Sequence, residues 1–513
     1  MDKTLIIIPI IIYLIAMLFI AYRVNNIKNN AKSFTNEYYL GSRSMGGFVL
    51  AMTIVATYVG ASSFIGGPGI AYNLGLGWVL LACIQVPTAF FTLGILGKKL
   101  SIISRKLNAI TIFDVLKARY NNGFLNVLAS IMLIVFFISA IVAQFIGGAR
   151  LFEAVTGLSY LTGLIIFSSV VIIYTTFGGF RAVTLTDAIQ AVVMFAATIV
   201  LFVVILKHGN GMENIMMKIK DIDPNLLRPD SGGNIAKPFI MSFWILVGIG
   251  ILGLPATTIR CMAFKDTKAM HNAMIIGTSL VGVLVLGMHL VGVMGRAVIP
   301  DLQEVDKIIP ILALKNLYPI LAGVFIGGPL AAVMSTVDSL LIISSSTLIK
   351  DLYVTYLDKN ASEGKIKKIS MWTSFLIGLL VFILSIKPIS LIAWVNLFAL
   401  GGQEIVFFCP LILGLYWKGA NATGAIASIF TGIITYLTLE ILKTKILGLH
   451  NIVPGLTVAI IVFIIASYFG KKSDEKTIKI FFEYIVQAPA NGRTHTYERT
   501  VVRPSLTPFL TTR

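Results

Sequence analysis

Apolar runs long enough to cross a lipid bilayer recur along the whole chain and restrict what it can fold into. A helical span takes about 20 apolar residues, and 57% of this sequence is hydrophobic while only 12% is charged. The mean hydropathy of +0.89 indicates a polytopic membrane protein. The runs predict an all-α protein of about 13 transmembrane helices, centred near residues 4–22, 47–72, 75–97, 124–148, 160–178, 188–207, 238–258, 273–294, 318–346, 370–387, 389–416, 420–442 and 452–470.

The basic residues predict how the chain is oriented in the membrane. The formal net charge of +18 does not indicate a nucleic-acid partner, because the lysines and arginines stand in short clusters between the apolar runs. Alternate connections collect these clusters on one side, which marks that side as cytoplasmic. We therefore expect a multi-pass protein of the cell membrane, surrounded by lipid, with its N-terminus outside and its C-terminus in the cytoplasm. The clusters are Arg23, Lys28, Lys32 and Arg43; Lys98, Lys99, Arg105, Lys106, Lys117 and Arg119; Arg260, Lys265 and Lys268; and Lys350, Lys359, Lys365, Lys367 and Lys368.

The second apolar run contains residues that interrupt a helix. Residues 57–72 read TYVGASSFIGGPGIAY, with several glycines, Pro68 and the pair Ser62 and Ser63. Unwound backbone survives inside a membrane only where protein or an aqueous cavity surrounds it, so its freed oxygens need a polar partner. A transported ion or solute fits that need.

The ninth run carries more hydroxyl groups than a lipid-facing helix requires. Ser335, Asp338 and Ser339 are spaced to share one helix face, and a charged Asp338 facing lipid would cost about 3 kcal/mol. Serine, threonine and carbonyl oxygens together suit a hard monovalent cation. Close helix packing, which also favours small residues, is an equal alternative for Ser335 and Thr336 taken alone.

Sequence signatures of other energy sources and of enzymes do not occur. No phosphate-binding loop, His-Glu-x-x-His or Cys-x-x-Cys pattern appears, and the three cysteines have no paired spacing that indicates a disulfide framework or a zinc site. We expect a transporter that draws on an ion gradient and that has no enzymatic activity and no cofactor. An ion channel is a less favoured alternative, because the hydroxyl groups cluster asymmetrically in the second and ninth runs.

Motifs in several separate runs resemble the sodium:solute symporter family, to about residue 470. They read EYYLGSRSMGG at 37–47, GASSFIGGPG at 60–69, YTTFGGFRAVTLTDAIQAVVM at 174–194, AAVMSTVDS at 331–339 and GLYWKGANATGA at 414–425. Within the family, the likeness is closest to the members that carry pantothenate. It rests on SSFIGGPGIAYNLGLGWVLLACIQ at 62–85, GILGKK at 94–99, QFIGGARL at 144–151, GLPATTIRCMAFKD at 253–266 and GMHLVGVMGRAVIPDL at 287–302.

The resemblance implies a leucine-transporter-like fold, built from two inverted five-helix repeats whose first helices are interrupted. The glycine-rich stretch GIGILGLP at 248–255 agrees with an interruption in the seventh run, at the position that matches the second run. The implied organisation is a first helix and cytoplasmic loop (1–46), a first repeat (47–207), an external loop (208–237), a second repeat (238–417), two peripheral helices (418–470) and a cytoplasmic, disordered tail (471–513).

The resemblance also implies a sodium site between the second and ninth runs. By motif, its ligands are the carbonyl groups of Ala56 and Val59, together with oxygens of Ala332, Ser335 and Thr336. Sodium is the coupling ion, and no other metal is expected.

Two carboxylates are candidates for the ion pathway or for supporting the site. Asp187 follows the family's Gly-Gly-x-x-Ala-Val-x-x-Thr-Asp pattern, and either a helix-capping role or an inner cation vestibule explains it. Asp338 lies one turn beyond Ser335. Tyr58 stands where many relatives have an acidic residue, so a carboxylate ligand from the second run is in doubt.

The resemblance implies sodium-coupled import of pantothenate by alternating access. A symporter of proline, a sugar or a monocarboxylate is the alternative. Pantothenate carries a carboxylate, an amide and two hydroxyl groups, so its pocket needs polar side chains, a helix end for the carboxylate and apolar walls. The candidates for substrate binding are Ser62, Ser63, Gln85, Trp244, Asn396, Gln403 and Glu404.

Overall fold

The computed structural model describes residues 3–27, 43, 45–388 and 390–483, and their regular structure is helical apart from one isolated bridge between Met45 and Phe264. The first half consists of α1 (Lys3–Ile27), α3 (Gly47–Tyr58), η3 (Ser62–Gly66), α4 (Gly67–Leu74), α5 (Leu76–Cys83), α6 (Thr88–Phe91), η4 (Thr92–Gly97), α7 (Lys98–Lys106), α8 (Ile112–Tyr120), α9 (Gly123–Thr156) and α10 (Tyr160–His208). The connection α11 (Met212–Ile222), η5 (Pro224–Leu227) and η6 (Ser231–Gly233) follows.

The second half begins with α12 (Lys237–Phe243), η7 (Trp244–Ile249), η8 (Gly250–Gly253), α13 (Pro255–Ala263), α14 (Thr267–Val298), η9 (Val305–Lys307), α15 (Ile308–Asn316) and α16 (Pro319–Ser346). It continues with η10 (Thr347–Leu357), α17 (Glu363–Ser385), α18 (Ile392–Phe408), η11 (Cys409–Leu413) and α19 (Gly414–Tyr416). The last elements are α20 (Ala422–Ile441), η12 (Ile446–Gly448), α21 (Ile452–Phe469), α22 (Glu475–Ile478) and η13 (Lys479–Glu483).

These helices agree with the predicted all-α polytopic membrane protein. Among the described residues, ten helices are long and apolar enough to cross a membrane, and up to twelve if each of two bent pairs counts as one span. The helix α1 is apolar over Thr4–Ile20. The motif at 37–47 lies largely outside the described residues, as does the tail from residue 484. The prediction of disorder from residue 471 was wrong for residues 475–483, which form α22 and η13.

The two spans predicted near residues 160–178 and 188–207 are confirmed as candidate membrane spans, and they follow one another within a single assigned helix. A continuous helix, α10, runs through 49 residues and contains two apolar segments, Tyr160–Gly178 and Val183–His208.

The predicted interruptions are confirmed in both halves. The helix before the first break, Gly47–Tyr58, and the helix after it, Ser62–Leu74, are bent by 68°. The pair Lys237–Gly253 and Pro255–Ala263 is bent by 46°. Each bent pair opens one five-helix half, which is the arrangement expected of a protein with two inverted repeats.

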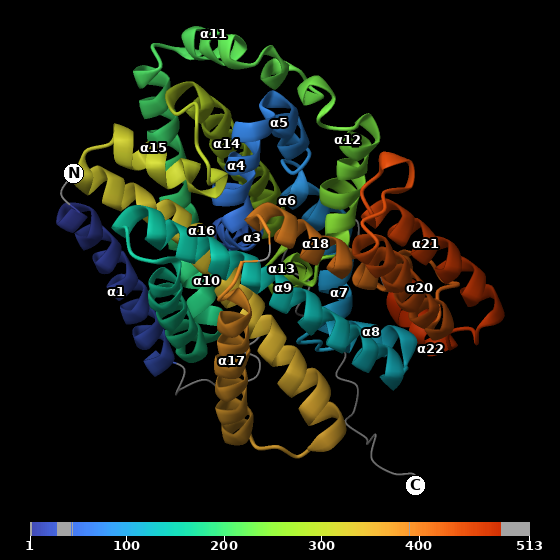
Figure 1. The fold of residues 1–513 in the computed structure, drawn as a ribbon. Coiled ribbons are helices and arrows are strands. Elements are labelled where there is room, and N and C mark those ends of the chain that lie inside the picture. Colours follow the sequence, from blue (N-terminus) through green and yellow to red (C-terminus); the bar gives the residue numbers. More distant parts are fainter. Residues whose placement is uncertain (1–2, 28–42, 44, 389, 484–513) are drawn as a thin grey trace.

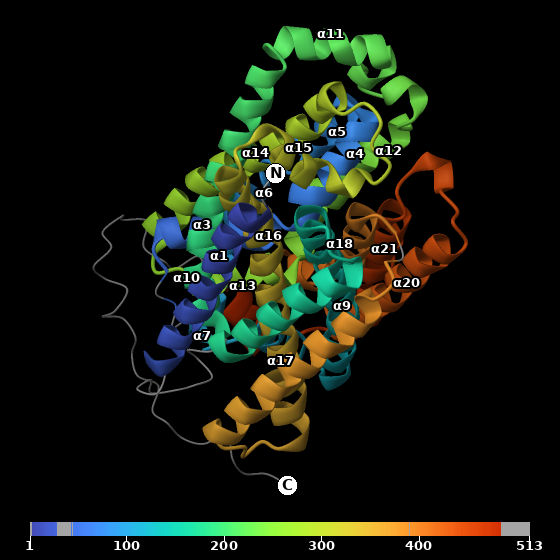
Figure 2. The ribbon, with the colours of Figure 1, turned by 60° about the vertical axis from the view of Figure 1, so that its left-hand side comes forward.

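The bent helices lie inside the bundle. Most residues of α3 are buried. Figures 1 and 2 show α9, α16 and α18 across the middle of the molecule, while α20 and α21 lie together at one edge. The helix α11 crosses one end of the molecule, and α17 extends at the opposite end. The buried centre is where the broken backbone can find polar partners.

Local chemistry explains where the first break falls. Val59 ends α3 in an extended conformation, with φ −88° and ψ 94°. A Cβ atom on Gly60 would lie 2.7 Å from Gln144 Oε1 and 2.7 Å from Thr336 Oγ1, so only glycine fits between these two side chains. Leu254 is extended at the second break, and Pro255 starts α13, the first helical position that proline favours.

Candidate functional site

Oxygen atoms from α3 and α16 meet at the first break. The hydroxyl group of Ser335 donates a hydrogen bond of 2.7 Å to the carbonyl oxygen of Ala56, and Thr336 Oγ1 lies 3.5 Å from the same oxygen. Both hydroxyl groups also lie 3.1 Å from the carbonyl oxygen of Ala332. All these residues are buried. The structure therefore brings together four of the five residues that the resemblance implied for sodium.

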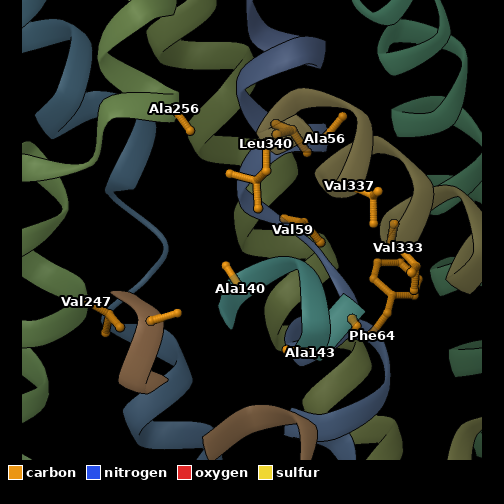
Figure 3. Packing of buried hydrophobic residues seen from close by; sticks show 14 of the residues in the cluster. Ala56, Val59, Phe64, Ala140, Ala143, Val247, Ala256, Val333, Val337 and Leu340 are labelled. Atoms are coloured by element: carbon orange, nitrogen blue, oxygen red, sulfur yellow. The ribbon is translucent and has the colours of Figure 1, made fainter. Parts of the chain in front are cut away.

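The fifth residue, Val59, lies at the break itself. Figure 3 shows Val59 near Ala56, with Ala140 of α9 on one side and Val337 of α16 on the other. The N–H group of Ser63, which would bond to Val59 in a continuous helix, donates instead to the carbonyl oxygen of Gly60 at 3.0 Å. The change of partner frees the Val59 carbonyl group from the helix, as required of a backbone ligand.

A cavity lies beside this oxygen cluster. Five of the predicted substrate-binding residues line it, namely Ser62, Ser63, Gln85, Asn396 and Gln403. The Asn396 amide group donates a hydrogen bond of 3.0 Å to Ser62 Oγ, which joins α18 to the helix that follows the break. Leu254, Ala140 and Leu400 supply apolar wall. Such a mixture of a few polar groups with apolar walls is typical of a small-molecule site.

Two predicted substrate-binding residues do not line the cavity. Trp244 begins η7 with 52% of its surface exposed, so it faces away from the bundle. Glu404 is fully buried and packs beside Gly250, where an added Cβ atom would lie 2.2 Å from its Oε2. The structure therefore does not place these two residues on the wall of this cavity; Trp244 begins the π-helical turn η7, and Glu404 lies in α18.

Residues that sequence reasoning missed also line the cavity: Thr57, Tyr58, Gln144 and Thr257. Gln144 Oε1 accepts a hydrogen bond of 2.7 Å from the N–H group of Ala61. Gln144 is an amide residue in the middle of the long apolar helix α9. That isolated polarity, together with its place at the start of the motif QFIGGARL, was a sequence signal that could have identified it.

Asp187 belongs to a buried polar cluster next to the cavity. Its Oδ2 accepts a hydrogen bond of 2.6 Å from Thr53 and lies 3.5 Å from Arg260 Nη2. Arg260 also donates to Ser339 Oγ at 2.9 Å, and Thr57 Oγ1 lies 3.4 Å from the same oxygen. Of the two roles weighed for Asp187, helix capping does not match this geometry, because its carboxylate binds side chains of α3 and α13 from within α10.

Asp338 faces the protein interior, as we predicted from the free energy that a charged carboxylate would cost in lipid. Its side chain is fully buried and accepts a hydrogen bond from the hydroxyl group of Tyr174. Tyr174 also donates to the carbonyl oxygen of Met334 at 3.2 Å. This contact fixes the α16 turn that carries Ser335.

The connection between α14 and α15, residues 299–307, covers the helix that follows the break. The Tyr72 hydroxyl group of α4 bonds to the carbonyl oxygens of Ile299 and Pro300 and accepts from the N–H group of Leu302 at 3.1 Å. A Cβ atom on Gly69 would lie 2.8 Å from the carbonyl oxygen of Val305. We call residues 299–307 the covering loop.

Charged side chains tie the covering loop to α9. Arg150 Nη1 lies 2.9 Å from Glu153 and 2.8 Å from Glu304, and Lys307 Nζ lies 3.1 Å from Glu153 and 2.9 Å from Glu304. Asp306 beside them is mostly buried, and its burial raises its pKa to about 6, although the backbone of Ile392 and the charge of Arg150 oppose this rise.

Comparisons with known proteins agree with this geometry. The Sodium:solute symporter family pattern matches residues 38–432. The chain is 46% identical to the sodium/pantothenate symporter of Escherichia coli (strain K12), over 92% of this chain and 98% of that protein. It is 30% identical to the osmoregulated proline transporter OpuE of Bacillus subtilis (strain 168), over 93% of this chain and 97% of that protein.

The solved structure of a Na⁺-coupled sialic acid symporter has the same fold. It superposes with a TM-score of 0.79 and 19% sequence identity, covering 92% of this chain and 98% of that one. Identity this low shows the fold alone. The leucine-transporter-like fold of two inverted repeats, implied by the resemblance, is confirmed.

Proposed function

Because the chain belongs to the sodium:solute symporter family, we propose that it imports pantothenate together with sodium. The observation that carries the proposal is 46% identity, over nearly the full length of both chains, to a sodium/pantothenate symporter. Identity to the proline transporter is only 30%. The difference favours pantothenate over proline as the solute.

Sodium would bind among the oxygens of Ala56, Val59, Ala332, Ser335 and Thr336. The support is chemical, because carbonyl and hydroxyl oxygens without a formal charge suit a hard monovalent cation. The hydroxyl groups of Ser335 and Thr336 each lie within 3.5 Å of the carbonyl oxygens of Ala56 and Ala332. When sodium arrives, the Ser335 hydroxyl group would release the carbonyl oxygen of Ala56. Both oxygens would then face the ion.

Pantothenate would occupy the cavity beside the break. The residues that line it are uncharged, with amide groups on Gln85, Gln144, Asn396 and Gln403. Such groups can bond to the amide and hydroxyl groups of the vitamin precursor, while Leu254 and Leu400 can pack against its dimethyl carbon. The polar start of the helix after the break would favour its carboxylate.

Gly60 would couple the two ligands. Gly60 lies between Gln144 at the cavity and Thr336 at the oxygen cluster, with no room for a Cβ atom between these two side chains. A shift of the break on sodium binding would therefore move the wall of the cavity. Sodium would favour one of two alternating states by binding it more tightly, and the bundle would rock around the occupied site.

The orientation in the membrane follows from the basic clusters. We propose that the ends carrying Lys98, Lys117 and Lys350 face the cytoplasm, so that the N-terminus and the covering loop lie outside and the C-terminus inside. The repeats would span residues 47–207 and 238–417, with 1–46, 208–237, 418–470 and 471–513 as the remaining segments.

Uptake by the purified protein in liposomes tests the proposed function. Labelled pantothenate should accumulate when a sodium gradient points inward and should not when potassium replaces sodium. An excess of unlabelled pantothenate should compete with the label, and an excess of proline should not. Sodium-independent uptake, or competition by proline alone, would contradict the proposal.

A further inference from the structure

The side chain of Gln144 is bound to a backbone N–H group at the first break. The side chain is 1% exposed, yet it lines the cavity. Its Oε1 accepts from the N–H group of Ala61 at 2.7 Å, at the start of the helix that follows the break. Free N–H groups at such a start attract anions, because they carry partial positive charge.

The amide nitrogen of Gln144 is available to a ligand. Nε2 donates no hydrogen bond to any of the described residues, while Gln403, another buried amide residue that lines the cavity, uses its Nε2 on the carbonyl oxygen of Ala399. Because the side chain lines the cavity, a group held there can accept a hydrogen bond from Nε2–H. A ligand oxygen in the cavity supplies that acceptor.

The neighbours of Gln144 hold it against the break. Gly147 lies on the same face of α9, and a Cβ atom there would lie 2.6 Å from the Cβ atom of Ala61. The two chains thus approach closely at Ala61. Gly60 lies against Gln144 on one side and against Thr336 on the other.

We propose that Gln144 determines specificity for a carboxylate substrate. Without substrate, its amide oxygen fills the carboxylate position on the Ala61 N–H group. A substrate carboxylate replaces that oxygen, and the displaced amide then donates Nε2–H to it. This assignment rests on the proposed transport of pantothenate, and it names the residue that distinguishes the acid from a neutral analogue.

Binding measurements on purified variants test the assignment. Gln144→Glu keeps the shape of the side chain but fixes a negative charge at the carboxylate position. It should weaken pantothenate binding at least roughly tenfold, because like charges are brought together. Binding of pantothenyl alcohol, in which a hydroxymethyl group replaces the carboxylate, should change less than about threefold, because no such repulsion acts on it.

Gln85→Glu is the matched control, since it adds the same charge to the same cavity, and no described contact joins its side chain to Ala61. It should weaken pantothenate binding clearly less than Gln144→Glu does. Gln144→Leu removes both polar atoms without adding charge, and it replaces Gln144→Glu in the test if that variant does not fold. It should weaken the binding of pantothenate more than the binding of pantothenyl alcohol.

The outcomes separate this inference from the proposed function. If the unaltered protein binds no pantothenate, the proposed function fails. Suppose instead that the unaltered protein binds pantothenate. The assignment of Gln144 is then overturned if Gln144→Glu binds pantothenate as tightly as the unaltered protein, or if Gln85→Glu loses as much pantothenate affinity as Gln144→Glu. Selective loss of the acid in the Gln144 variants supports it.

Discussion

The guanidinium group of Arg260 lies 3.5 Å from the carboxylate of Asp187, and neither side chain is exposed. The pair joins α13, which follows the second break, to α10. Thr53 of α3 contacts both partners, at 2.6 Å from Asp187 and 3.2 Å from Arg260. Both broken helices are therefore fastened to α10 through one buried ion pair, next to the cavity.

Neutralising one member of this pair should destabilise the protein. Removing one partner of a buried ion pair costs about 3–5 kcal/mol, because the other charge stays buried without its counterion. We expect Arg260→Gln and Asp187→Asn each to lower the melting temperature of the purified protein markedly. The double variant should lose less than the sum of the single losses, and a strictly additive loss would argue against the pair.

The sequence predicted the features that depend on local chemistry. Glycines and Pro68 mark the first break. The second break was predicted in the same way from the glycine-rich stretch before Pro255. Ser335 and Thr336 were assigned to the ion site by the family resemblance, since the residues alone left close helix packing as an equal alternative.

Contacts between distant helices could not be predicted from the residues. Gln144 and Ala61 are 83 positions apart, and an isolated amide indicates only that some polar partner exists. The direction in which Trp244 points depends on the π-helical turn that begins with it, which no periodicity reveals. The ion pair of Arg260 was missed because a basic residue at the end of an apolar run was attributed to orientation in the membrane.

The sodium site can be tested through its two hydroxyl groups. Ser335→Ala combined with Thr336→Ala should raise the sodium concentration for half-maximal uptake roughly tenfold or more, since each lost hydroxyl ligand is worth about 1 kcal/mol. Ser344→Ala is the control, because Ser344 is a buried serine of the same helix whose hydroxyl group, among the described residues, bonds only to its own turn, at Leu340. Unchanged sodium dependence in the double variant would reject the site.

Gly60 offers a test of coupling between the two ligands. In Gly60→Ala, the new methyl group would lie 2.7 Å from both Gln144 Oε1 and Thr336 Oγ1, closer than van der Waals contact allows. We expect this variant to bind both pantothenate and sodium more weakly. The measurement is the half-saturation concentration of each ligand in uptake, and both values should rise. In Gly46→Ala, at the N-terminal end of α3, the new methyl group meets nothing within 4 Å, so this variant should leave both values unchanged. A Gly60→Ala variant that alters one ligand alone would argue against coupling through this residue.

Asp306 in the covering loop should make stability depend on pH. Burial raises its pKa to about 6 from an ordinary value of 3.8, so the folded protein holds a proton that the unfolded chain releases. This contribution to stability is complete below about pH 4 and is lost as the pH rises through 6.

Asp306→Asn mimics the protonated side chain at every pH and should therefore remove this loss. The variant and the unaltered protein should melt at similar temperatures near pH 4, and the variant should melt higher at pH 7.5. Glu304→Gln is the contrasting variant, since its ion pairs with Arg150 and Lys307 hold the pKa of Glu304 below its usual value. It should lower stability most at neutral pH, where the carboxylate is charged and paired. The difference in melting temperature between Asp306→Asn and the unaltered protein should grow from pH 4 to pH 7. If it does not, Asp306 is not buried as a neutral acid in the covering loop.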